Sequence, residues 1–237
     1  MLERCESIPC IETMLNWQAN AAKPAAKSRD NMRIGLIGRS LNSFDTETSL
    51  RDLAQELTTF GHECLLFLSE KELKPTDRAT RFASFYISLD GKIFPVQVQK
   101  VEQGPVLLFA VSSAEAAVFA AAVAVILQKL AEKEIKIDLM HLFNAEDLCT
   151  ALACRQYSHV PFVYSVRNFK ELKQRKTDFL CLKLKPPSRS VQTGDYLYVE
   201  QLAAETARYV VDETAMPKLW PVFFSAFAGK CVVGKPY

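Results

Sequence analysis

The sequence lacks the features that mark several large classes of protein. None of its seven cysteines stands in a Cys-x-x-Cys pair, which argues against a zinc site, and their odd number argues against a disulfide framework. Its longest apolar run, from Ala116 to Leu127, is shorter than the roughly 20 residues that a membrane span requires. The first residues, MLERCESIPC, carry charges and no apolar core like that of a signal peptide. We therefore predict a protein of a reducing, cytoplasmic compartment, with no metal site and no membrane association.

An excess of charge of one sign is also missing. Lysine and arginine number 29 and aspartate and glutamate 27, a net charge of +2, so the composition gives no reason to expect nucleic acid as a partner. Hydrophobic residues make up 49% of the chain and charged residues 24%, which is typical of a globular protein. No internal repeat is present.

Two regions of different character divide the chain. Residues 1–31 show no sustained periodicity and end in a polar stretch rich in alanine and proline, which is typical of a tail or linker. We expect them to pack weakly against the fold, because they bury few apolar groups relative to the entropy lost on ordering them. Residues 32–237 are predicted to form one α/β domain.

Short apolar runs alternate with helical stripes in that domain. The run 32–38, the helical stripe 49–61 and the run 62–69 together predict a βαβ unit. The segment 84–100 predicts a hairpin, because Asp90-Gly91 suits a type I′ turn. Further strands are predicted at 105–111, 137–143, 160–166 and 208–213, further helices from an N-cap at Ser112-Ser113 to about Lys133, over 145–156 and over 195–207, a charged surface piece at 169–176 and a loop at 185–194. This order favours a doubly wound, mostly parallel, Rossmann-like sheet with helices on both faces.

Ligands of such folds bind beyond the carboxyl ends of the strands, so the loops 38–48, 110–114, 141–145 and 166–171 are the ones to inspect. A phosphate site needs glycine amides after the first strand, yet the first loop has no glycine after Gly38. Asp45 and Glu47 in this loop would repel an anion, and Arg39 is its one cation. The pattern is typical of an ordinary capped loop between a strand and a helix.

Three polar residues in the later loops have two interpretations each. His141 ends an apolar strand, where a histidine is more often structural than catalytic, and Asn144 suits the N-cap of the following helix. Arg167 either holds an anionic group with its planar fork or is solvated. No Ser/His/Asp arrangement and no G-x-S-x-G elbow is present.

Three segments resemble the N-terminal domain of the GT-B glycosyltransferases, the superfamily of the glycogen and starch synthases. MRIGLIG with DLAQELTTFGHEC resembles the opening strand and the helix-to-strand step of that domain. IDLMHLFNAEDLCTALA resembles its "H-x-H-D" strand and helix, and VPFVYSVRNF resembles its "T-hydrophobic-H-N" strand. YVEQLAAETARYVV is similar, more faintly, to its closing helix and strand, so the resemblance covers about residues 32–213.

The same resemblance implies that catalytic groups are missing. The family's glycine-rich loop falls on Phe44, Asp45, Thr46 and Glu47, and its transfer-centre histidine falls on Arg167. His141 matches the first histidine of the "H-x-H-D" segment, its aspartate falls on Asn144, and Asn168 matches the asparagine of the later strand. The family binds most of its nucleotide sugar through a second Rossmann-like domain, and the sequence ends at Tyr237, about where that domain would begin.

Three functions follow as hypotheses. The first is a glycosyltransferase-like domain, catalytically incomplete alone, that binds a glycan or a protein partner. The second is the acceptor side of a split, active transferase whose donor-binding subunit is another polypeptide, with His141 and Arg167 as its candidate catalytic residues. The third is an interaction module without a ligand. No cofactor is expected, and the candidate ligand-binding residues, predicted to share one rim of the sheet, are Arg39, Ser112, His141, Asn144, Arg167 and Asn168.

Overall fold

The computed structural model describes residues 31–39, 46–113, 115–166, 173–184, 192–193, 195–212 and 231–233. All but the last residue of the predicted tail, and the candidates Arg167 and Asn168, lie outside these residues. The division into a tail and one domain therefore stays a prediction.

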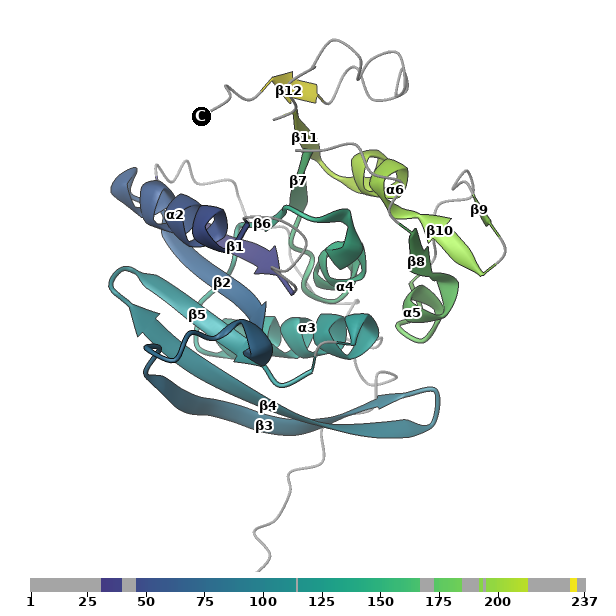
Figure 1. Cartoon of the computed structure of the whole chain (residues 1–237), viewed down its shortest axis with the longest axis horizontal. Coiled ribbons are helices and arrows are strands. Elements are labelled where there is room, and N and C mark those ends of the chain that lie inside the picture. Colours follow the sequence, from purple (N-terminus) through teal and green to yellow (C-terminus); the bar gives the residue numbers. More distant parts are fainter. Residues whose placement is uncertain are drawn as a thin grey trace, which may run out of the picture.

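A nine-stranded sheet forms the centre of the described fold (Figure 1). Its order is β12-β11-β7-β6-β1-β2-β5-β4-β3, and every pair is parallel except those made by β3 and β4. The strands are β1 (Arg33–Gly38), β2 (Glu63–Ser69), β3 (Ala79–Leu89), β4 (Lys92–Gln103), β5 (Val106–Val111), β6 (Leu139–Leu142), β7 (Phe162–Val166), β11 (Tyr209–Asp212) and β12 (Cys231–Val233). The predicted doubly wound, mostly parallel sheet is confirmed.

Helices cover both faces of this sheet, and each face has its own apolar core. Helix α2 (Thr46–Thr59) packs on one face through Leu50 and Ala54. Helices α3 (Ala116–Glu132) and α4 (Leu148–Ser158) pack on the other face. Helix α3 is buried continuously from Ala117 to Leu127, because the sheet, α4 and the β3–β4 hairpin surround it (Figure 1).

The predicted hairpin is confirmed and is longer than its sequence pattern. Asp90 and Gly91 have φ angles of 48° and 74°, as a type I′ turn requires. Pairing continues back to Ala79 opposite Val101, with a register shift between Arg81 and Ala83. One face of the hairpin buries Phe85 and Val98 in the core around α3, so tertiary packing extends the strands beyond their alternating stretch.

Three predicted elements were wrong in detail. The N-cap of α3 is Glu115 and not Ser112 or Ser113, so the helix begins later than the serines suggest. The predicted helix over 145–156 opens with a 3-10 turn, η3 (Ala145–Asp147), before α4. The predicted helix over 195–207 opens with a strand, β10 (Tyr196–Tyr198), before α6 (Val199–Thr206), because alternating Tyr-Leu-Tyr pairs well in a sheet.

The charged segment 169–176, predicted as surface, is exposed at Lys173 and Arg175 and buried at Gln174. Its residues Lys173–Arg175 form β8, which pairs with β10 in a small sheet that also holds β9 (Gln192–Thr193). Helix α5 (Lys176–Leu180) follows at once and buries Phe179. Gln174 in β8 is 6% exposed, so this segment contributes a polar side chain to the interior.

Gly35 provides a test of the packing between β1 and β6. A Cβ atom at this position would overlap the Sδ atom of Met140, which is fully buried in the neighbouring strand. We expect Gly35→Ala to lower the free energy of unfolding by about 1–3 kcal/mol through overpacking. Urea denaturation measures the free energy of unfolding. In the Gly35→Ala/Met140→Ala double variant the total loss of this free energy should be smaller than the sum of the losses in the two single variants. Additive losses would contradict this close approach.

Candidate functional site

The carboxyl ends of β1, β2, β5, β6 and β7 lie at one edge of the sheet, because these strands are parallel. The chain winds outward in both directions from β1, so the crevice between β1 and β6 is the topological switch point where such folds bind ligands. Arg39, Ser112, His141 and Asn144, four of the six predicted residues, follow or end strands at this edge.

An ion pair between Arg39 and Asp147 closes the switch point. The Arg39 Nε donates to Asp147 Oδ1 at 2.9 Å, and the Arg39 backbone N–H donates to Oδ2 at 3.1 Å. The Asp147 side chain is 2% exposed and that of Arg39 16%. Burial raises the pKa of Asp147, and the charge and hydrogen bonds of Arg39 oppose that rise. The one cation of the first loop is therefore engaged by a carboxylate of the chain itself.

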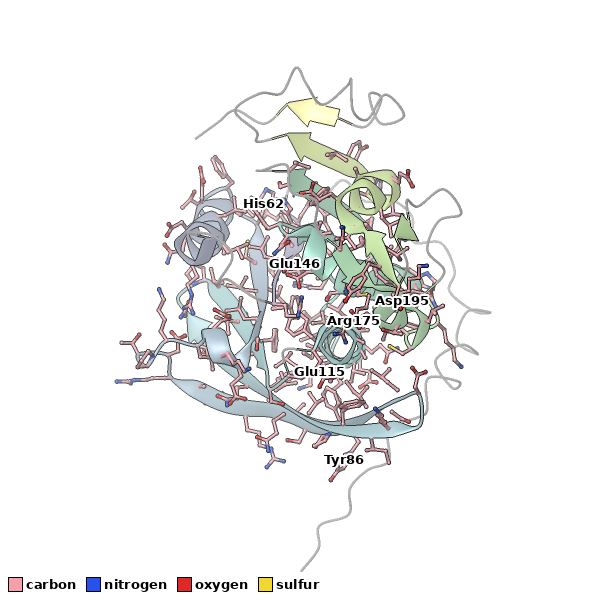
Figure 2. The ribbon with its side chains drawn as sticks, turned by 45° about the vertical axis from the view of Figure 1, so that its right-hand side comes forward. His62, Tyr86, Glu115, Glu146, Arg175 and Asp195 are labelled. Carbon is pink, nitrogen blue, oxygen red and sulfur yellow. The ribbon has the colours of Figure 1, made fainter. Side chains whose placement is uncertain are left out.

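Carboxylates gather where the helices begin at this edge. Glu115 is the N-cap of α3, Glu146 and Asp147 lie in η3 before α4, and Asp178 lies in the first turn of α5. Figure 2 shows Glu115, Glu146 and Arg175 at this side of the protein. Burial raises the pKa of Asp178, as does nearby Glu115, while Gln174, Arg175 and Arg39 lower it. The positive ends of the helix dipoles thus face carboxylates, which opposes the binding of a phosphate.

Gln174 lies among these groups with an unsatisfied amide. Its side chain influences the pKa of both Cys149 and Asp178, which places it against the first turns of α4 and α5. Yet neither its amide nitrogen nor its amide oxygen makes a hydrogen bond of acceptable geometry with any residue that the structure describes. A buried amide whose hydrogen bonds are incomplete costs about 1–3 kcal/mol.

The other predicted residues have structural partners. The Nε2 atom of His141 is 2.7 Å from Oγ of the buried Ser165, and its ring stacks on Phe143. Asn144 caps η3 by accepting a hydrogen bond from the Glu146 N–H, which confirms its predicted capping role. The Ser112 hydroxyl accepts a hydrogen bond from the Gln97 N–H and so extends the β4–β5 pairing.

The described cysteines show no reactive character. Cys64, Cys149 and Cys154 are buried and free, and Cys181 is half-buried. Burial raises the pKa of Cys64 and of Cys181 to about 11 and raises those of Cys149 and Cys154 as well, so all four stay protonated near neutral pH. Among the described residues no cluster of histidine, cysteine and acidic side chains has metal-binding geometry. No helix in the described part of the chain is long and apolar enough to cross a membrane.

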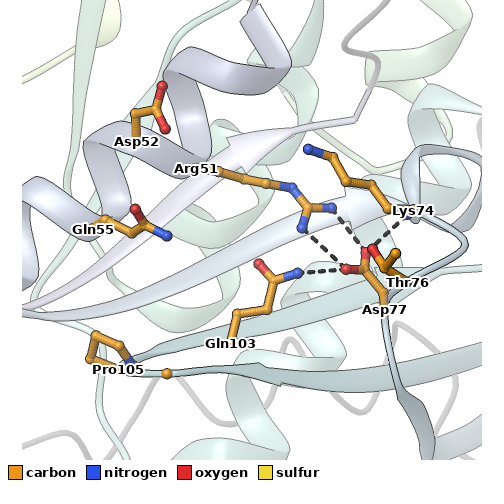
Figure 3. A pocket seen from close by; sticks show the side chains of 9 residues that line it. Arg51, Asp52, Gln55, Lys74, Thr76, Asp77, Gln103 and Pro105 are labelled. Carbon is orange, nitrogen blue, oxygen red and sulfur yellow. Dashed lines mark hydrogen bonds and ion pairs between the residues drawn. The ribbon is translucent and has the colours of Figure 1, made fainter.

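A pocket of about 460 Å³ lies apart from this edge, beside α2 and the turn between β4 and β5 (Figure 3). Its wall holds an ion pair in which Arg51 Nη2 donates to Asp77 Oδ2 at 3.0 Å. The Gln103 amide and the Lys74 backbone N–H also donate to Asp77. Burial raises the pKa of Asp77, but the hydrogen bonds from Arg51, Lys74 and Gln103 outweigh it and lower the pKa. These contacts fix the loop before β3, which holds Lys74 and Asp77, to Arg51 of α2. They therefore have a structural role.

Sequence reasoning missed Asp147 and Gln174. Asp147 stands three residues after Asn144, and its acidic side chain at the start of a predicted helix was a signal that could have found it. Gln174 stands in the run KELKQRK, whose charges indicate a solvated surface, and nothing in the local sequence marks it as buried.

The Arg39–Asp147 pair predicts a pH-dependent effect. Arg39 opposes the raised pKa of Asp147. We therefore expect Arg39→Met to lower the free energy of unfolding by about 2–4 kcal/mol at pH 7, because the buried Asp147 carboxylate would be left without its cation. In this variant the folded-state pKa of Asp147 rises further above its unfolded value. The loss of unfolding free energy should therefore shrink as the pH falls from 7 towards 5, because Asp147 becomes protonated in the folded state. Urea unfolding across this range measures it. Asp138→Asn is the control, because it removes an exposed carboxylate that also accepts a backbone N–H. It should lower the free energy of unfolding by less than about 1 kcal/mol.

The Asp77 pair predicts the opposite dependence on pH. A lowered folded-state pKa means that Asp77 contributes stability above the ordinary carboxyl pKa and loses it as the pH falls through the folded value. Asp77→Asn should lower the free energy of unfolding by about 1–3 kcal/mol at pH 7. Below about pH 4 the variant and the parent chain should approach the same stability. Urea unfolding at both pH values tests this, with Asp52→Asn at the exposed rim as the control. An unchanged difference at low pH would contradict the assignment.

Comparisons with known proteins give no sequence relative but a clear structural likeness. No protein-family model matches the sequence, and no curated protein is similar to it. The catalytic domain of starch synthase IV from Arabidopsis thaliana, bound to ADP and acarbose, superposes with a TM-score of 0.66 at 12% identity over 86% of this chain. Sucrose-phosphate synthase from Thermosynechococcus elongatus superposes with a TM-score of 0.51 at 11% identity, also over 86%. The chain spans 51% and 47% of those two chains, about half of each. The protein thus has the Rossmann-like fold found in GT-B glycosyltransferases.

Proposed function

We propose that this chain is a glycosyltransferase-like domain that binds a hydroxyl-rich glycan at the carboxyl edge of its sheet and does not transfer sugar by itself. The observation that carries the proposal is Gln174, a buried amide without a hydrogen-bond partner among the described residues. A carboxamide offers a donor and an acceptor on adjacent atoms, which matches two neighbouring hydroxyls of a sugar. Ligand binding would remove the cost of leaving this amide unsatisfied.

The charges at the edge favour hydroxyls over anions. Glu115, Glu146 and Asp178 accept hydrogen bonds from hydroxyl groups and repel phosphates and carboxylates. Arg39, the one cation of the first loop, is held by Asp147. This arrangement supports a glycan as ligand and disfavours a pyrophosphate or a carboxylate of a protein partner.

One further point supports an incomplete catalytic unit. A transferase must stabilise the charge that develops on the departing phosphate, and the loop that should do so has Phe44, Asp45, Thr46 and Glu47 in the place of glycines. The buried, free thiols fit the proposed cytoplasmic location.

The fold shared with two transferases also supports a second candidate function. In that alternative the chain is the acceptor side of an active transferase, and another polypeptide supplies the donor-binding half. Both functions use the same edge for the glycan, so they differ in whether activity appears when a donor-binding partner is added.

A binding experiment tests the proposed site. The starch synthase structure contains acarbose and ADP, so both serve as probes in titration calorimetry. We expect acarbose to bind the purified chain and ADP to show no binding. Gln174→Leu should weaken acarbose binding by about tenfold or more, because two hydrogen bonds are lost. The same change should leave stability equal or higher, because it removes an unsatisfied buried amide.

Gln55→Leu is the matched control, since Gln55 lines the pocket beside α2. Acarbose binding that is unaffected by Gln174→Leu and lost with Gln55→Leu would move the glycan site to that pocket. Sugar transfer by the purified chain from ADP-glucose or UDP-glucose would contradict catalytic incompleteness. Transfer that appears only with a second polypeptide would establish the alternative.

A further inference from the structure

The last strand of the nine-stranded sheet, β3, has an unusual outer edge. Strand β4 pairs with one side of β3 from Ala79 to Leu89, and no described strand pairs with the other side. Figure 1 shows β3 at the outside of the sheet, away from α2 and α6. The backbone N–H and C=O groups on that side form a template for another strand.

Proteins usually protect such an edge, and β3 carries little protection. The segment Ala79–Leu89 contains no proline, no lysine and no glycine, and Arg81 is its only charged residue. The irregularity between Arg81 and Ala83 leaves the stretch Ala83–Leu89 regular. Serine and aromatic side chains alternate along its outer face, where Tyr86 is 50% exposed. A long edge with so little protection offers a template for a further strand.

We propose that the outer edge of β3 binds β3 of a second copy of this chain, antiparallel, about a two-fold axis at Tyr86. Tyr86 is the middle residue of the regular stretch Ala83–Leu89, so an axis there lets the whole stretch pair with itself. Ser84 then lies opposite the Ser88 position of the partner. The two sheets join into one continuous sheet across the interface.

Charge complementarity favours a second copy as the partner. Arg81 lies just before the regular stretch, and the exposed Asp90 follows at its other end. Antiparallel pairing about Tyr86 brings Arg81 of each copy beside the Asp90 position of the other, which gives two ion pairs. Within each copy Tyr86 lies opposite Pro95. Across the axis it would lie opposite Tyr86 of the second copy, so the four side chains would form an apolar row on the outer face of the joined sheet. Figure 2 shows the Tyr86 side chain directed away from the body of the protein.

Sedimentation equilibrium of the full chain tests the proposal. We expect a concentration-dependent monomer–dimer equilibrium. Tyr86→Lys places two like charges at the axis and should weaken the dimer by about tenfold or more. Gln97→Lys is the matched control, because it adds the same charge to the same face of the sheet on β4, opposite Ser84 and away from the edge. It should leave the dimer unchanged. Arg81→Glu should weaken the dimer, and adding Asp90→Lys should restore it, with a thermal melt confirming that each variant is folded.

Crosslinking provides a second, positive measurement. Tyr86→Cys should form a disulfide-linked dimer under mild oxidation, whereas Gln97→Cys should form no more of it than the parent chain. A full chain that stays monomeric at all accessible concentrations would overturn the proposal. So would a dimer that Tyr86→Lys leaves intact. A monomer whose β3 amides resist hydrogen exchange would show that another part of the chain covers the edge.

Discussion

The burial of helix α3 from Ala117 to Leu127 is the constraint on which the arrangement of the described domain depends. Its apolar residues point in all directions, so every side of the helix must be covered. The sheet covers one side, α4 another, and the β3–β4 hairpin folds across a third through Phe85, Val96 and Val98. The hairpin therefore closes the core of this face of the sheet as well as extending the sheet. The same packing brings the N-termini of α3 and α4 together at the carboxyl edge of the sheet.

That edge shows how one fold can carry different chemistry. Helix N-termini at the switch point of a doubly wound sheet are suited to phosphates. In this chain Glu115, Glu146 and Asp147 occupy them, and Asp147 also engages Arg39. The dipoles are thus already balanced by the protein, and the buried groups without a hydrogen-bond partner among the described residues there, the amide of Gln174 and the hydroxyl of Ser69, are neutral. The local electrostatics disfavour an anion, which supports the proposed hydroxyl-rich ligand.

The proposed glycan site and the proposed dimer surface lie on different parts of the sheet. One uses the carboxyl ends of its central parallel strands, and the other uses the outer side of its last antiparallel strand. The hairpin separates the two functions physically, because its inner face belongs to the core and its outer strand faces away from the switch point (Figure 1). A dimer formed through β3 would leave both carboxyl edges open to ligands.

The sequence by itself determined the fold class, because alternation of buried strands with amphipathic or apolar helices is a local pattern that only a layered α/β sandwich satisfies. It also determined the type I′ turn at Asp90-Gly91 and the capping role of Asn144, which depend on residues close in the chain. Only the tertiary structure decided that Arg39 meets Asp147, since these residues are distant in sequence and the crossing of β6 beside β1 joins them. Only it buried Gln174, whose charged neighbours Lys173 and Arg175 are exposed. Local patterns report the period of burial along one element, and a functional site is built where elements from distant parts of the chain converge.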